Sequence, residues 1–113
     1  MRIINQSKNK ILADRAALAK GLFERVKGLL GKNELKPGEA LVIPNCNSVH
    51  TFFMRFPIDL IFLDKRNNVV KIIRSMPPFR ITKVYFKASL VIELPSGILD
   101  ESLCRMGDNI LIK

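Results

Sequence analysis

The sequence predicts an α+β fold: a β-rich single domain over residues 1–113, built as a curled sheet or barrel of short strands with one amphipathic helix packed on it. Short apolar runs between turn-forming residues indicate the strands, and one segment with helical spacing indicates the helix. A length of 113 residues allows one hydrophobic core but not two.

The first elements are two short strands at residues 2–5 and 10–13, separated by a polar turn. Apolar side chains then recur at helical spacing from Leu18 to Leu30, just before a glycine, so we expect a helix over residues 16–30. After it the chain becomes rich in strands. The further strands are expected at residues 40–44, 48–55, 58–64, 69–74, 89–94 and 110–112.

The chain is strongly basic, with a formal net charge of +9 at pH 7. Residues 1–36 hold nine Lys and Arg against three Asp and Glu, and residues 37–113 hold ten against seven. Such an excess can attract nucleic acid, anionic lipid or an acidic protein. No apolar run is long enough for a membrane span or the core of a signal peptide, so we expect a cytoplasmic protein.

Cysteine usage and motifs predict neither disulfide, metal nor cofactor. Cys46 and Cys104 fit no disulfide framework and no Cys-x-x-Cys motif, so reduced thiols are expected. Cys46 and His50 could supply two metal ligands, but an extended strand would hold them about 13 Å apart, and no second histidine exists. The sequence also has no glycine-rich phosphate loop and no dinucleotide fingerprint.

The stretch around the only histidine is the main candidate for a site. It places His50, Arg55 and Asp59 inside an otherwise apolar run. An ionised group buried without a partner is costly, so each must be paired, exposed or functional. His50 could be a core histidine bonded to a carbonyl or carboxylate, or it could act as a base or ligand.

Two carboxylates, Asp59 and Glu93, lie within apolar strands. Such a pair could perform general acid–base catalysis, or each acid could be the structural partner of a cation. A thiol activated by His50 is a further catalytic possibility, because only the thiolate form of Cys46 or Cys104 would attack. Whether these groups converge depends on the fold.

Several motifs in order resemble those of the domain-of-unknown-function 192 family. They are Glu24-Arg25-x-x-Gly28-Leu29-Leu30-x-Lys32-x-x-Leu35, Cys46-x-x-x-His50-Thr51-x-x-Met54-x-x-x-Ile58-Asp59-x-x-Phe62-Leu63-Asp64, Glu93-Leu94-Pro95-x-Gly97 and Gly107-Asp108. The resemblance covers residues of about 10 to 112. The family's usual glycine is Ala40 here, and its frequent tryptophan is Phe53. The resemblance implies a compact β-rich fold with one packed helix, and it implies no activity.

Our leading functional hypothesis is a small non-catalytic binding or accessory domain for an unidentified ligand or protein. Its candidate ligand-binding residues are Cys46, His50, Thr51, Met54, Arg55, Asp59 and Glu93. The first alternative is a nucleic-acid-binding module, because residues 53–56, 79–80 and 83–87 interleave bases with aromatic residues. The second is a thiol- or carboxylate-dependent hydrolase.

A buried ion pair is predicted for Arg25, which falls within the apolar stripe of the expected helix and so needs an acid such as Asp59 or Glu93. Removing one partner should lower the free energy of unfolding by about 3–5 kcal/mol. Arg25→Met should therefore destabilise more than a double variant that also neutralises the acid, as measured by urea denaturation. An Arg25→Met variant as stable as the wild type would contradict the pair.

Overall fold

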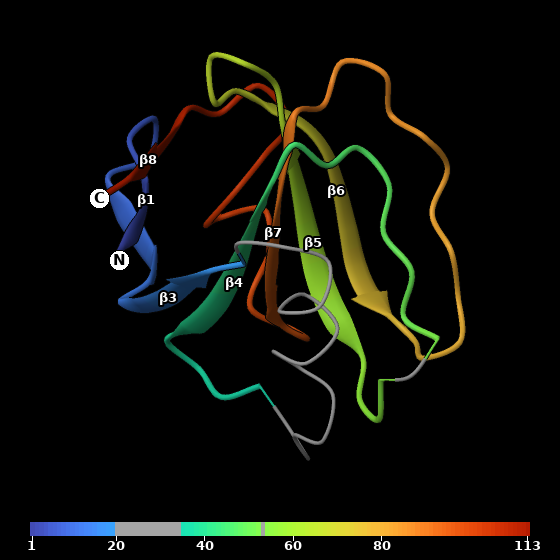
Figure 1. Cartoon of the computed structure of the whole chain (residues 1–113). Helices are drawn as coiled ribbons and strands as arrows, with labels where there is room; N and C mark the ends of the chain where they lie inside the picture. Colours follow the sequence, from blue (N-terminus) through green and yellow to red (C-terminus); the bar gives the residue numbers. More distant parts are fainter. Residues whose placement is uncertain (20–34, 53) are drawn as a thin grey trace.

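The computed structural model describes residues 1–19, 35–52 and 54–113, which form β strands joined by turns and loops (Figure 1). The strands are β1 (Ile3–Asn5), β2 (Lys10–Ala13), β3 (Arg15–Leu18), β4 (Glu39–Pro44), β5 (Ile58–Leu63), β6 (Val69–Met76), β7 (Leu90–Pro95) and β8 (Ile110–Ile112). In this part of the chain, no helix is long and apolar enough to cross a membrane.

The strands form two sheets. The larger has the order β3-β4-β7-β5-β6, and the smaller has the order β2-β1-β8. Neighbours are antiparallel except β3 and β4, which are parallel. Neither sheet closes into a barrel, because the outermost strands of each are not paired with one another among the described residues.

The predicted α+β class is therefore wrong: the described residues are all-β, with two open sheets and no helix. The start of the expected helix is strand β3, in which Ala16 pairs with Ala40 and Leu18 with Val42. Ala and Leu favour helices locally, but hydrogen bonding to β4 overrides that weak preference. Residues 20–30 of the expected helix lie outside the described residues.

The positions of most other strands were predicted correctly, since seven of the expected apolar runs overlap β1, β2, β4, β5, β6, β7 and β8. The exception is residues 48–55, which contain only an isolated bridge between His50 and Ile81. This segment is instead part of a long loop. Its backbone is hydrogen-bonded to a second loop, residues 77–88.

The core lies on both faces of the five-stranded sheet. All six residues of β5 are buried, with Leu60 and Phe62 in one apolar cluster and Ile61 and Leu63 in the other. Side chains alternate along a strand, so a continuous apolar run fits a strand that is covered on both sides. The cluster on one face includes residues of the small sheet, such as Ile3 and Ile110, and the cluster on the other includes loop residues such as Met54 and Ala88.

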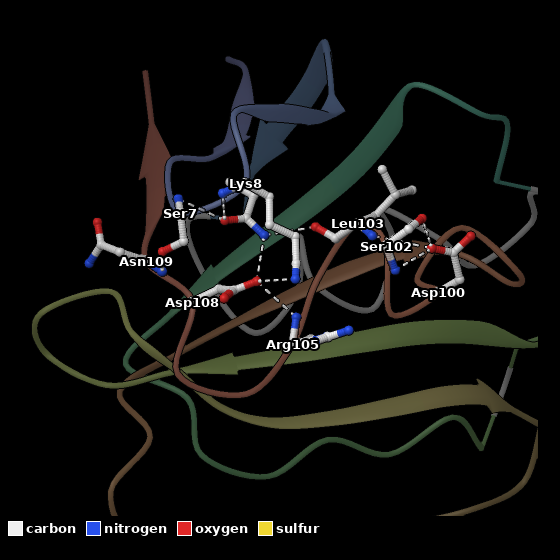
Figure 2. Close-up of polar contacts among 9 residues, drawn as sticks. Ser7, Lys8, Asp100, Ser102, Leu103, Arg105, Asp108 and Asn109 are labelled. Carbon is white, nitrogen blue, oxygen red and sulfur yellow. Dashed lines mark hydrogen bonds and ion pairs between the residues drawn. The ribbon is translucent and has the colours of Figure 1, made fainter.

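A polar network fixes the β1–β2 hairpin to the segment before β8 (Figure 2). The side-chain amide of Asn5, which is fully buried, donates to the Leu103 carbonyl at 2.7 Å and to Asp108 at 2.8 Å. The Asn5 side-chain oxygen accepts the backbone N–H groups of Ser7 and Lys8. The Lys8 ammonium lies 3.5 Å from the Asp108 carboxylate.

This network predicts a loss of stability in acid. Burial opposes ionisation of Asp108, but hydrogen bonds from Asn5 and Arg105 and the charge of Lys8 outweigh it and lower the pKa of that carboxyl. A carboxyl whose pKa is lower in the folded state stabilises the fold at neutral pH, and this contribution disappears as the pH falls through the lowered pKa. Urea denaturation from about pH 5 downward should show a shallower loss of stability for Asp108→Asn than for the wild type.

The matched control is Glu101→Gln, which neutralises an exposed carboxyl in the same segment. It should leave the acid dependence close to that of the wild type. If Asp108→Asn and Glu101→Gln lose stability equally steeply, the network does not hold Asp108 ionised.

Candidate functional site

The structure does not gather the predicted ligand-binding residues into one site. His50 and Arg55 are exposed, whereas the other five are buried: Cys46, Thr51, Met54, Asp59 and Glu93. Most of the predicted residues therefore belong to the interior. Each of these buried residues has different contacts, so they do not form a common site.

The two buried acids face opposite sides of the large sheet. Asp59 pairs with Leu94, and Glu93 pairs with Leu60, in the antiparallel ladder of β5 and β7. Leu94 lies in the cluster under the small sheet and Leu60 in the cluster under the loops. Because paired residues share a face, the two carboxylates cannot act together as a general acid and base.

Asp59 anchors two backbone turns. One carboxylate oxygen accepts the Ser75 N–H at 2.7 Å, and the other accepts the Leu99 N–H at 2.9 Å. Ser75 lies at a bulge in β6 and has a positive φ of 52°. The Arg74 guanidinium donates to the Leu99 carbonyl, so both backbone groups of Leu99 are bonded. Arg25 lies outside the described residues, and its ion pair stays a prediction.

The environment of the thiols does not favour nucleophilic chemistry. Burial raises the pKa of Cys104 to about 11, with a further contribution from the charge of Asp108. A nucleophilic cysteine needs a lowered pKa. Cys46 is buried, and its thiol donates to the Ser48 carbonyl at 3.1 Å. In the described part of the chain, no three His, Cys, Asp or Glu side chains lie together as metal ligands would.

Two long loops lie side by side along one edge of Figure 1, residues 45–52 and 54–57 in green and residues 77–88 in orange. Their backbones run antiparallel and are joined by hydrogen bonds. These bonds are Tyr85 N–H to Asn47 O (2.9 Å), Thr82 N–H to Val49 O (2.9 Å), Thr51 N–H to Arg80 O (2.8 Å) and Phe79 N–H to Thr51 O (2.9 Å). We call this pair of segments the loop ladder.

Thr51 joins the two segments of the loop ladder by hydrogen bonds on their buried side. Its side chain is fully buried, where its hydroxyl donates to the Pro77 carbonyl at 2.7 Å and accepts the Arg80 N–H at 3.0 Å. Val49 is buried as well. Since Val49 and Thr51 point inward, the residues that alternate with them, His50 and Phe52, face solvent.

The exposed side chains of the two loops are apolar or basic. These residues, which we call the aromatic–basic surface, are His50, Phe52, Arg55, Phe79, Arg80, Ile81, Lys83, Val84, Phe86 and Lys87. The His50 and Phe52 rings stack, with centroids 5.1 Å apart and planes 24° from parallel. The sequence contains no Asp or Glu in residues 40–58 or 65–92, so the two loops contribute only positive charges.

Phe79 combines two unfavourable features. Its backbone has a positive φ of 62°, and its side chain is 66% exposed. A positive φ is rare for a bulky residue and costs about 1–3 kcal/mol. From the sequence, Phe79 was a candidate only within the nucleic-acid alternative, because a positive φ leaves no local signal there beyond the preceding prolines.

The model of one protein family matches residues 3–112 of this chain: DUF192, described as "Uncharacterized ACR, COG1430". The chain belongs to the DUF192 family. This confirms the resemblance expected from its motifs. The family description assigns no activity.

Relatives of this DUF192 chain occur in archaea. A UPF0127 protein of Pyrococcus horikoshii is 35% identical over 114 residues, which cover 96% of each chain. A UPF0127 protein of Thermococcus sibiricus is 32% identical over 112 residues, covering 96% of this chain and 72% of the relative. The crystal structure of a protein of unknown function from Novosphingobium aromaticivorans superposes with a TM-score of 0.81 and 20% identity, covering 98% of this chain and 82% of that one. It shows the same fold.

The backbone of Phe79 predicts an unusual response to mutation. Phe79→Gly removes the exposed ring and relieves the positive φ, whereas Phe79→Ala removes the ring and keeps the strain. We expect Phe79→Gly to be at least as stable as the wild type and about 1 kcal/mol more stable than Phe79→Ala. Urea denaturation of the three proteins measures both differences. A marked loss of stability in Phe79→Gly would instead make the ring a structural element.

Proposed function

We propose that this chain is a non-catalytic binding domain whose ligand site is the aromatic–basic surface and whose partner is negatively charged. The observation that supports this proposal most strongly is Phe79, a large apolar side chain that is exposed to solvent on a strained backbone. The Phe79 N–H contributes a backbone hydrogen bond to the loop ladder, but the exposed ring adds no burial of its own. Strained residues and clustered exposed apolar side chains are both typical of binding sites.

The proposed site is the exposed surface above the predicted residues, not the set of predicted residues itself. His50 and Arg55 remain part of it, whereas Thr51 and Met54 lie beneath it as buried residues. The rigid anchoring by Thr51 means that the surface is formed before the partner binds, which lowers the entropic cost of binding.

The charge of the loops supports an anionic partner. Four cations, Arg55, Arg80, Lys83 and Lys87, are exposed on the two loops, which contain no acid. A surface of one sign attracts partners of the opposite sign and repels others like itself. The cytoplasmic location expected from the sequence is part of the same proposal.

The separation of the titratable groups supports binding over hydrolysis. Asp59 and Glu93 lie on opposite faces of the sheet, and Cys104 has a raised pKa. These were the groups on which the hydrolase alternative depended. Nucleic acid is one partner with the proposed negative charge, and the stacked rings of His50 and Phe52 favour it because bases stack on such rings.

Retention on a heparin column should test the proposed surface. Heparin is a polyanion without planar rings, so it reports the electrostatic part of binding alone. The double variant Arg80→Gln/Lys83→Gln should elute at a clearly lower salt concentration than the wild type, because it removes two cations from the site.

The matched control is Arg2→Gln/Lys113→Gln, which removes one Arg and one Lys from the exposed ends of the chain. Both ends lie beside the small sheet, away from the loop ladder (Figure 1). The control should elute nearer to the wild type. If the two double variants shift equally, retention reflects net charge alone, which contradicts a site on the loops.

A further inference from the structure

We infer that the partner of the aromatic–basic surface is single-stranded nucleic acid, bound with little sequence preference. This inference rests on the proposed function and adds the class of ligand. In this assignment the rings of Phe52 and Phe79 stack on bases, and Arg80, Lys83 and Lys87 contact phosphates. Three observations lead to it. They are the apolar and basic side chains that follow one another along one loop, the arrangement of the exposed rings, and the need of such rings for bases that are not already stacked in a duplex.

The first feature is the alternation of apolar and basic side chains. In the 77–88 loop, the pairs Phe79–Arg80, Lys83–Val84 and Phe86–Lys87 each join an exposed apolar residue to an exposed cation. A membrane-binding loop instead gathers its apolar residues at a tip and keeps its cations behind them. A single strand of nucleic acid offers both bases and phosphates along its whole length, so it can meet both kinds of side chain along this loop.

The second feature is the arrangement of rings. His50 stacks on Phe52 and lies opposite Ile81 in the loop ladder, so one face of the ladder presents ring surface beside an aliphatic side chain. Phe79 and Phe86 lie on either side of Ile81 in the second loop and add two more exposed rings, and the Phe86 side chain is 89% exposed. An acidic protein would be attracted by the cations, but it would gain less from several separate rings than a strand of bases would.

The third feature favours single strands over duplexes. The bases of a duplex are stacked inside it, where Phe rings cannot reach them, whereas the bases of a single strand are free to stack on protein. The loop ladder is also held rigid by the buried Thr51. A rigid surface of rings and cations suits an extended strand without reading its sequence.

Fluorescence anisotropy of a labelled oligothymidylate of about 16 nucleotides tests the inference with the full chain. We expect binding at low salt that weakens as salt is added, because phosphate contacts release counterions. Phe52→Ser and Phe79→Gly should each weaken binding about tenfold through lost stacking. They should leave the salt dependence unchanged, because neither alters charge. Circular dichroism and urea denaturation establish that each variant is folded.

The basic variants separate charge from stacking. Arg80→Gln/Lys83→Gln should reduce the slope of log affinity against log salt by about 1.4, which is about 0.7 for each lost phosphate contact to a single strand. The control Arg2→Gln/Lys113→Gln should keep the slope of the wild type. An unlabelled duplex of the same length should compete less well than an unlabelled single strand.

Several outcomes would overturn the inference. They are no binding at low salt, binding that Phe52→Ser and Phe79→Gly leave unchanged, equal competition by duplex, and stronger binding to polyglutamate or to phosphatidylserine vesicles. If heparin retention still depends on Arg80 and Lys83, the proposed function stands and only the nucleic-acid assignment fails. If heparin retention is also independent of these residues, both fail.

Discussion

The burial of β5 on both faces is the constraint on which the rest of the structure depends. Its apolar side chains must be removed from water on two sides, and each buried Leu, Ile or Phe contributes about 1.5–3 kcal/mol when it is fully covered. One sheet alone cannot supply this cover. The small sheet therefore packs on one face, and residues of the two loops, 45–52, 54–57 and 77–88, pack on the other.

Because the two loops cover the core, the side chains on their outer side are held in fixed positions. A loop that must cover a core needs its backbone hydrogen bonds satisfied, and the two loops satisfy them by pairing with each other. Thr51 completes this pairing from the buried side, where its hydroxyl both donates and accepts. Once the inward side chains fix the loops, the outward ones are held in place and can serve a partner.

Stability and the proposed binding role are assigned to different residues. Asp59 stabilises the bulge of β6 and the turn after β7 through two backbone amides, and Asn5 and Asp108 hold the amino-terminal hairpin. None of these side chains belongs to the aromatic–basic surface. A charged residue within an apolar strand is therefore not by itself a sign of a functional site, because it can satisfy buried backbone groups instead.

The sequence by itself determined the composition, the basic charge, the family and most strand positions, because apolar runs and turn residues are local signals. Local signals failed at Arg15–Leu18, where pairing with β4 makes a strand from helix-favouring residues. Tertiary structure alone decided that Asp59 and Glu93 face apart, that Thr51 is an anchor and that Phe79 is strained and exposed. These properties depend on strand register and on contacts between residues far apart in the chain, which no local pattern of side chains specifies.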